Sequence, residues 1–117
     1  MSELTKIIER IRDFNEARDW RQFHNPKDMA LSLVLEAAEV MEHFQWKNAE
    51  EMAEHLKNKK EEVGDELADV LYWVLHMSDE FGIDILDALD KKMIKNEAKY
   101  PVEKARGSNK KYTEHQV

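Results

Sequence analysis

The sequence has no cysteine, only three glycines and two prolines, and no long apolar run. Without cysteine the chain cannot form disulfides, thiolate nucleophiles or cysteine-ligated zinc and iron–sulfur sites. So few turn-forming residues argue against an all-β domain, which needs many tight turns. No apolar stretch approaches the roughly 18 residues of a membrane-spanning helix, and the N-terminal segment lacks the apolar stretch of a signal peptide. We therefore expect a cytoplasmic protein with no membrane partner.

Acidic residues outnumber basic ones, and the two kinds are unevenly distributed. The 117 residues carry a formal charge of −7, with 22 acidic and 10 basic side chains in residues 1–90 but 3 acidic and 8 basic ones in residues 91–117. A domain that binds double-stranded nucleic acid normally presents a basic face, so the acidic body argues against such a partner. The length suits a single domain over residues 1–117, with an irregular basic tail from about residue 103.

Helix-forming residues dominate the chain, and its apolar residues recur at helical spacing. The helix-start signals are Asn25-Pro26, Asn48 and Asp84, whereas Gly82 suits a helix C-terminus and Pro101 blocks helix continuation. The predicted helices span about residues 3–18, 26–46, 49–57, 59–81 and 84–99. The sequence therefore predicts an all-α fold of the four-helix-bundle type with one short additional helix.

Two of the predicted helices carry acidic pairs in their most apolar stretches. In MALSLVLEAAEVM the charged residues are Glu36 and Glu39, and in ELADVLYWVLHM they are Glu66 and Asp69. Each pair is three residues apart and so lies on one face of its helix. If the two faces pack together, four carboxylates meet, and their repulsion and desolvation call for a counter-charge. Because oxygen ligands suit Mg²⁺ or Mn²⁺ better than zinc, we predict a Mg²⁺ site with Mn²⁺ as an alternative.

A single acidic pair of this kind is common on a solvated helix face, so the joint occurrence of two pairs carries the prediction. His43 and His76 continue the two acidic stripes, and we interpret them as packing residues rather than ligands. A di-iron bundle would need Glu-x-x-His on two helices. No histidine of this chain has a glutamate three residues before it, which argues against that alternative.

Carboxylate-bound magnesium is suited to phosphate chemistry, because it bridges to phosphate oxygens and activates water. The chain has no glycine-rich phosphate loop, so metal and side chains would have to hold the phosphates. The lysines of the C-terminal quarter could neutralise outlying phosphates. Three indole rings could stack on a nucleobase, those of Trp20, Trp46 and Trp73.

The sequence resembles the MazG-like all-α nucleotide pyrophosphohydrolases, and most of all their dCTP pyrophosphatase branch. The resemblance covers nearly the whole chain and is carried by RDWRQFHNPKDMALSLVLEAAEVMEHFQW (18–46), ELADVLYWVL (66–75), KMIKNEAKYPV (92–102) and KYT (111–113). It implies hydrolysis of a nucleoside triphosphate, dCTP or a related or modified dNTP, to the monophosphate and pyrophosphate as nucleotide-pool house-cleaning. It also implies Mg²⁺ dependence and a homodimer or homotetramer.

The resemblance further implies roles for individual residues. Those implied in catalysis and metal binding are Glu36, Glu39, Glu66 and Asp69. Those implied in substrate binding are Trp20, His24, Trp46, Trp73, Lys92, Asn96, Tyr100, Lys111 and Tyr112. Relatives often have Tyr at the position of Trp73, and the substrate-contacting His of some relatives corresponds to Ile11, so the preferred base stays open.

Two other functions stay open at this point. The chain could be a non-catalytic helical oligomer that binds nucleotide or metal as a sensor, or a structural interaction module whose acidic residues face solvent. The sensor predicts Mg²⁺-dependent binding without turnover. The interaction module predicts that Mg²⁺ with a non-hydrolysable nucleotide leaves the melting temperature unchanged, because a ligand raises it only by binding the folded state.

Overall fold

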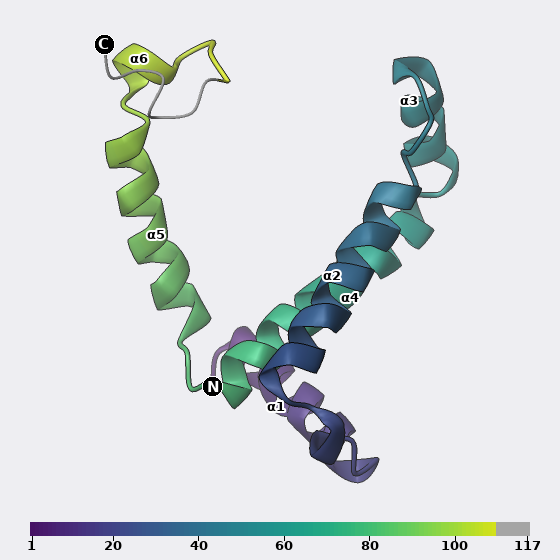
Figure 1. Ribbon diagram of the computed structural model, residues 1–117, viewed down its shortest axis with the longest axis vertical. Coiled ribbons are helices and arrows are strands. Elements are labelled where there is room, and N and C mark those ends of the chain that lie inside the picture. Colours follow the sequence, from purple (N-terminus) through teal and green to yellow (C-terminus); the bar gives the residue numbers. More distant parts are fainter. Residues whose placement is uncertain (110–117) are drawn as a thin grey trace. The chain divides into compact units, whose positions relative to one another are not determined.

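The computed structural model describes residues 1–109 and divides the chain into two compact units, Met1–Gly82 and Ile83–Val117 (Figure 1). The described residues form helices and turns and no strand, which confirms the all-α class. The first unit holds α1 (Glu3–Ala17), the 3-10 turn η1 (Arg21–Phe23), α2 (Pro26–Glu42), α3 (Ala49–Asn58) and α4 (Lys60–Glu80). The second unit holds α5 (Ile85–Lys99) and α6 (Val102–Ala105). The single-domain organisation stays a prediction, and none of the described helices has the length and apolarity needed to cross a bilayer.

The helix starts predicted at Asn25, Asn48 and Asp84 are confirmed by side-chain caps. The Asn25 side chain accepts a hydrogen bond from the Asp28 N–H at 2.8 Å, directly before Pro26 in the first turn of α2. Asn48 and Glu51 bond reciprocally to each other's backbone N–H at the start of α3. These caps satisfy N–H groups that a helix leaves without an internal partner.

Two predicted boundaries are wrong. α2 ends at Glu42 instead of near Trp46, because residues 43–46 turn towards α3 and Trp46 adopts a φ of 67°. This left-handed conformation is uncommon for a tryptophan and is invisible to hydrophobic periodicity. The tail predicted to be irregular from about residue 103 contains the short helix α6, which follows Pro101.

α2 and α4 form the most extensive helix pair of the first unit and lie side by side in Figure 1. They run antiparallel, because His24 before α2 contacts His76 late in α4, whereas Glu39 late in α2 lies beside Glu66 early in α4. α1 and α3 also pack on α4. α4 is therefore the central helix of the first unit, and its acidic stripe faces α2.

Few apolar side chains are buried in the described part of the chain. The buried apolar residues are Met29, Val63 and Leu75. Several large apolar side chains of α2 remain more than half exposed, among them Leu31 (54%), Val34 (63%) and Leu35 (65%). Contiguous exposed apolar surface of this kind is typical of protein–protein interfaces.

Candidate functional site

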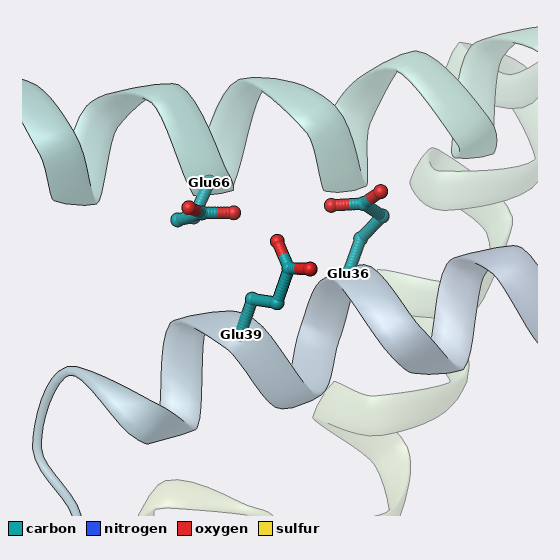
Figure 2. Close-up of side chains that lie close together, drawn as sticks. All are labelled: Glu36, Glu39 and Glu66. Carbon is teal, nitrogen blue, oxygen red and sulfur yellow. The ribbon is translucent and has the colours of Figure 1, made fainter.

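Three carboxylates meet between α2 and α4. Glu36 and Glu39 extend from α2 and Glu66 from α4, and the three side chains point into the same space (Figure 2). One carboxylate oxygen from each lies within 4.8 Å of the others. Residues three apart on a helix share a face, so Glu36 and Glu39 point in the same direction. Because this face of α2 packs on α4, both acids point towards α4. The structure thus brings together three of the four predicted ligands, hereafter the acidic cluster.

Two oxygen atoms of the acidic cluster are buried without a partner. Glu36 Oε2 and Glu66 Oε2 accept no hydrogen bond from the residues that the structure describes. Removing a carboxylate oxygen from water without supplying a donor is energetically unfavourable. A divalent cation would supply the missing positive partner, and a set of carboxylate oxygens is the kind that Mg²⁺ and Mn²⁺ prefer. The residues therefore fit the predicted ion.

The crowding of these acids changes their protonation. The pKa of Glu66 is raised to about 7, first because a hydrogen bond with the Glu39 carboxyl favours the protonated form and then because burial disfavours the charge. The charges of Glu39, Asp69 and Glu36 add to the same effect. The pKa of Glu36 is also raised, chiefly by burial and then by the charges of Glu39 and Asp69. Without a cation, the acidic cluster therefore retains part of a proton at neutral pH.

Asp69, the fourth predicted carboxylate, lies one helical turn beyond Glu66 on α4. It is not one of the three residues whose oxygens converge, although its charge raises the pKa of both Glu36 and Glu66. It instead lines a neighbouring pocket of about 250 Å³, hereafter the aromatic pocket. The other lining residues are Phe14, Trp20, His24, Tyr72 and Trp73.

Edge-to-face ring contacts build the walls of the aromatic pocket. The ring centroids of Phe14 and Trp20 are 5.4 Å apart, and those of His24 and Trp73 are 5.3 Å apart. Tyr72 and Trp73 of α4 also meet edge to face, at 5.1 Å. This geometry is favourable for aromatic pairs. Indole and phenol rings around a small cavity offer stacking surfaces for a planar ligand.

Hydrogen bonds to the buried Asn15 hold these walls in place. Asn15 is fully buried, and its Oδ1 accepts a hydrogen bond from the Tyr72 hydroxyl at 2.8 Å. Its side-chain amide donates to the Ile11 carbonyl at 3.0 Å, and its own carbonyl accepts from the Trp20 N–H at 3.0 Å. A single asparagine thus links α1, α4 and the backbone of the pocket tryptophan.

Ion pairs tie the segment between α1 and α2 to the end of α4. Arg21 donates through Nε and Nη2 to both carboxylate oxygens of Glu80, at 2.8 and 3.2 Å, and through Nη1 to Glu16 at 3.0 Å. Arg12 makes a similar two-point contact with Asp79, at 3.0 and 2.7 Å, which lowers the pKa of that carboxyl. Two-point contacts fix direction as well as distance. The contact of Arg12 therefore holds α1 against α4, and that of Arg21 holds the segment that carries Trp20 and His24.

A pair of histidines completes this side of the pocket. His24 Nδ1 lies 2.8 Å from His76 Nε2, and the ring of His76 is 1% exposed. The pKa values of both imidazoles are lowered, chiefly by burial. His76 therefore packs beneath the pocket and is not part of the acidic cluster, in line with its predicted packing role.

The predicted roles in substrate binding stay predictions, both for the pocket residues Trp20, His24 and Trp73 and for the remaining six. Trp46 is 91% exposed in the turn after α2 and is not among the residues that line the aromatic pocket. In the second unit, α5 carries Lys92 and Asn96 and is capped by Tyr100. Two predicted residues lie outside the described part of the chain, Lys111 and Tyr112.

Two pocket residues, Phe14 and Tyr72, were not predicted. Phe14 lies on the apolar stripe of α1, so its helical spacing predicted a core residue and not a pocket residue. Tyr72 stands next to Trp73, but its partner Asn15 is 57 residues away. Asn15 follows Ile8 and Ile11 at helical spacing on the apolar stripe of α1, and a polar residue on that stripe was the available signal, because a buried amide needs partners.

Comparison with known proteins now identifies the family. The family model described as MazG-like matches residues 31–114, which include both acidic pairs of α2 and α4. The chain belongs to the MazG-like family. This MazG-like chain is 38% identical over 104 residues to dCTP pyrophosphatase 1 of Rattus norvegicus and of Homo sapiens. The aligned region covers 87% of this chain and 61% of each relative, so the chain spans about three-fifths of the length of these curated relatives.

A solved structure shows the same fold. A pyrophosphatase from Archaeoglobus fulgidus DSM 4304 is 38% identical to this MazG-like chain and superposes with a TM-score of 0.82. The match covers 86% of this chain and 94% of the archaeal one. The predicted MazG-like fold, close to the dCTP pyrophosphatase branch, is thereby confirmed.

Proposed function

We propose that this chain hydrolyses a nucleoside triphosphate between the α and β phosphates, releasing the monophosphate and pyrophosphate. The preferred substrate in this proposal is dCTP or a related or modified deoxynucleotide. The acidic cluster carries the proposal, because its oxygens converge, two of them are buried without a hydrogen-bond partner, and no Lys or Arg among residues 1–109 forms an ion pair with them, which is what a cation site needs. The relatives named dCTP pyrophosphatase 1 and the archaeal pyrophosphatase support the same activity.

In this proposal Glu36, Glu39 and Glu66 hold Mg²⁺, or Mn²⁺ in its place, with Asp69 at the edge of the site. Once bound, the ion would neutralise phosphate charge and lower the pKa of a water that attacks phosphorus. Glu66, Asp69 and Trp73 lie on successive turns of α4, so the acidic cluster and the aromatic pocket are neighbours. A nucleotide whose triphosphate reaches the acidic cluster could place its base among the pocket rings.

Product analysis tests the reaction. With dCTP and Mg²⁺ we expect dCMP and pyrophosphate, and release of orthophosphate would contradict cleavage between the α and β phosphates. A panel of canonical and modified dNTPs and NTPs, scored for pyrophosphate, would identify the preferred base and sugar. The panel also separates this activity from the sensor alternative, which binds nucleotide and Mg²⁺ tightly without releasing pyrophosphate from any member.

Variants of the acidic cluster test the site. Glu36→Gln and Glu66→Gln should each lower kcat by about 100-fold or more, the scale seen when one charge-stabilising group is removed from an active site. Glu61→Gln is the matched control, because Glu61 is an exposed acid of α4 outside the acidic cluster. Full activity in either cluster variant, or an equal loss in the control, would contradict the assignment.

We also propose that the chain assembles into a homodimer or homotetramer. The exposed apolar side chains of α2 support this, because a water-facing helix would carry polar residues at such positions. Size-exclusion chromatography with light scattering measures the mass directly, and a monomer at micromolar concentration would contradict the proposal. A nucleotide-pool substrate fits the expectation of a cytoplasmic enzyme.

A further inference from the structure

Two histidines share one hydrogen bond at the wall of the aromatic pocket. His24 Nδ1 and His76 Nε2 are 2.8 Å apart, so one nitrogen donates and the other accepts. If His76 donates, the remaining nitrogen of His24 carries a proton and the remaining nitrogen of His76 has a lone pair. If His24 donates, the remaining nitrogen of His24 has a lone pair and the remaining nitrogen of His76 carries a proton. The direction of one hydrogen bond therefore decides what His24 presents to a ligand.

The buried nitrogen of His76 distinguishes the two arrangements. His76 Nδ1 is inaccessible and has no hydrogen-bond partner among residues 1–109. If His24 donated, this nitrogen would be an N–H group buried without an acceptor. Orphaned buried N–H groups are rarer in proteins than under-satisfied acceptors. The arrangement in which His76 donates leaves only a lone pair unsatisfied and is therefore favoured.

This argument requires both rings to be neutral at neutral pH. Burial lowers the pKa of His76 first of all, and the nearby His24 and Arg21 lower it further against the opposing effect of Glu80 and Asp79. Burial also lowers the pKa of His24. A third proton would turn one of the two rings into an imidazolium, and burial disfavours that charge. The pair therefore shares two protons, one on each ring.

We propose that His76 is a positioning residue that holds His24 in the tautomer protonated at Nε2, so that the aromatic pocket presents an N–H donor to the nucleobase. His24 lines the pocket beside Trp73 and Asp69, and its Nε2 makes no hydrogen bond within the described chain. The complementary atom of the base is an acceptor, either a carbonyl oxygen or an unprotonated ring nitrogen, and not an exocyclic amine. This inference rests on the proposed function, since it assigns the base to the aromatic pocket.

Nitrogen-15 NMR of the histidine rings in the whole chain tests the tautomer without any turnover. We expect His24 and His76 both to be protonated at Nε2 at neutral pH. A proton on Nδ1 of His24 would overturn the inference, whatever the activity of the protein. Conversely, if the tautomers are as expected but the protein releases no pyrophosphate, the proposed reaction is refuted and the inference about the tautomer is not. The two failures are thus distinguishable.

The same spectra test contact with the base. A saturating non-hydrolysable dCTP analogue with Mg²⁺ should shift the His24 Nε2–H signal. A deoxyribose triphosphate that lacks a base should leave that signal unchanged. No shift with the dCTP analogue, or an equal shift with the compound that lacks a base, would overturn the assignment of His24 to base recognition.

Variants of His76 test its positioning role. His76→Phe keeps a ring of similar size but removes the donor, and His76→Gln restores an N–H near the same place. For dCTP, KM should rise about three- to tenfold in His76→Phe, as for the loss of one hydrogen bond, with kcat nearly unchanged. His76→Gln should recover most of the loss. An unchanged KM in His76→Phe would overturn the proposal.

The second histidine pair of the chain supplies the matched control. His43 Nδ1 and His55 Nε2 are also 2.8 Å apart, where α2 turns into α3 and outside the aromatic pocket. His55→Phe removes the same kind of bond and should leave KM for dCTP unchanged. An equal rise of KM in His55→Phe would show that the effect of His76→Phe is general loosening of the fold and not loss of the donor.

Discussion

Binding of Mg²⁺ to the acidic cluster should expel protons, in a number that depends on pH. The pKa of Glu66 is about 7 in the chain without metal, and carboxylates must be deprotonated to bind a cation. A group with this pKa is about 90% protonated at pH 6, about half protonated at pH 7 and about 10% protonated at pH 8. Each ion bound should therefore release about 0.9, 0.5 and 0.1 proton from Glu66 at these three pH values. Glu36, whose pKa is also raised, adds to these numbers.

Isothermal titration calorimetry in buffers of different protonation enthalpy counts the protons. Glu66→Gln should remove the share that belongs to Glu66, whereas the control Glu61→Gln should release as many protons as the unchanged chain. Mg²⁺ binding without proton release at pH 6 would refute the reasoning that these carboxylates hold the ion. Undiminished release in Glu66→Gln would refute the assignment of the raised pKa to Glu66.

Three further outcomes follow from the contacts around the site. Tyr72→Phe should lower the free energy of unfolding by about 1–3 kcal/mol, because the buried Asn15 Oδ1 loses its donor, and an unchanged denaturation midpoint would contradict this. The pKa of Asp79 is lowered by Arg12, so its stabilising contribution is present above the ordinary aspartate pKa of about 4 and is lost as pH falls through the lowered value. Denaturation of Arg12→Met should therefore differ from that of the unchanged chain at neutral pH and converge with it in acid, whereas a constant difference would contradict the ion pair. Leu35→Glu should lower the mass measured by light scattering if α2 forms the subunit interface, and an unchanged oligomer would exclude this face.

Local features of the fold could be predicted from the sequence because their causes are local. Asn25 and Asp84 each bond to a backbone N–H three residues ahead, so a short window of sequence contains both partners. The end of α2 has a different kind of cause. The turn that includes Trp46 brings His43 against His55 of α3, a contact that no periodic pattern contains. Such tertiary contacts override helix propensity at the ends of helices.

The candidate site also has one part that could be predicted from local sequence and another part that depends on tertiary contacts. Helical spacing was enough to predict that Glu36 and Glu39 share a face and meet an acid of the other helix. It could not fix the register between the helices, which brings Glu66 into the acidic cluster and Asp69 to the aromatic pocket. The polar contacts that shape the pocket join residues 52 and 57 positions apart in the chain, so only the folded structure shows them.

The crowded carboxylates between α2 and α4 also bear on how long the polypeptide survives. Their mutual repulsion favours separation of the two helices, and a cation that neutralises them shifts the balance towards the closed form. Proteases cleave the transiently opened form, and its population rises as the closed form loses stability. If the proposed Mg²⁺ site is correct, a shortage of the ion would raise the population of the opened form, so the abundance of the chain would fall together with any activity that depends on the ion.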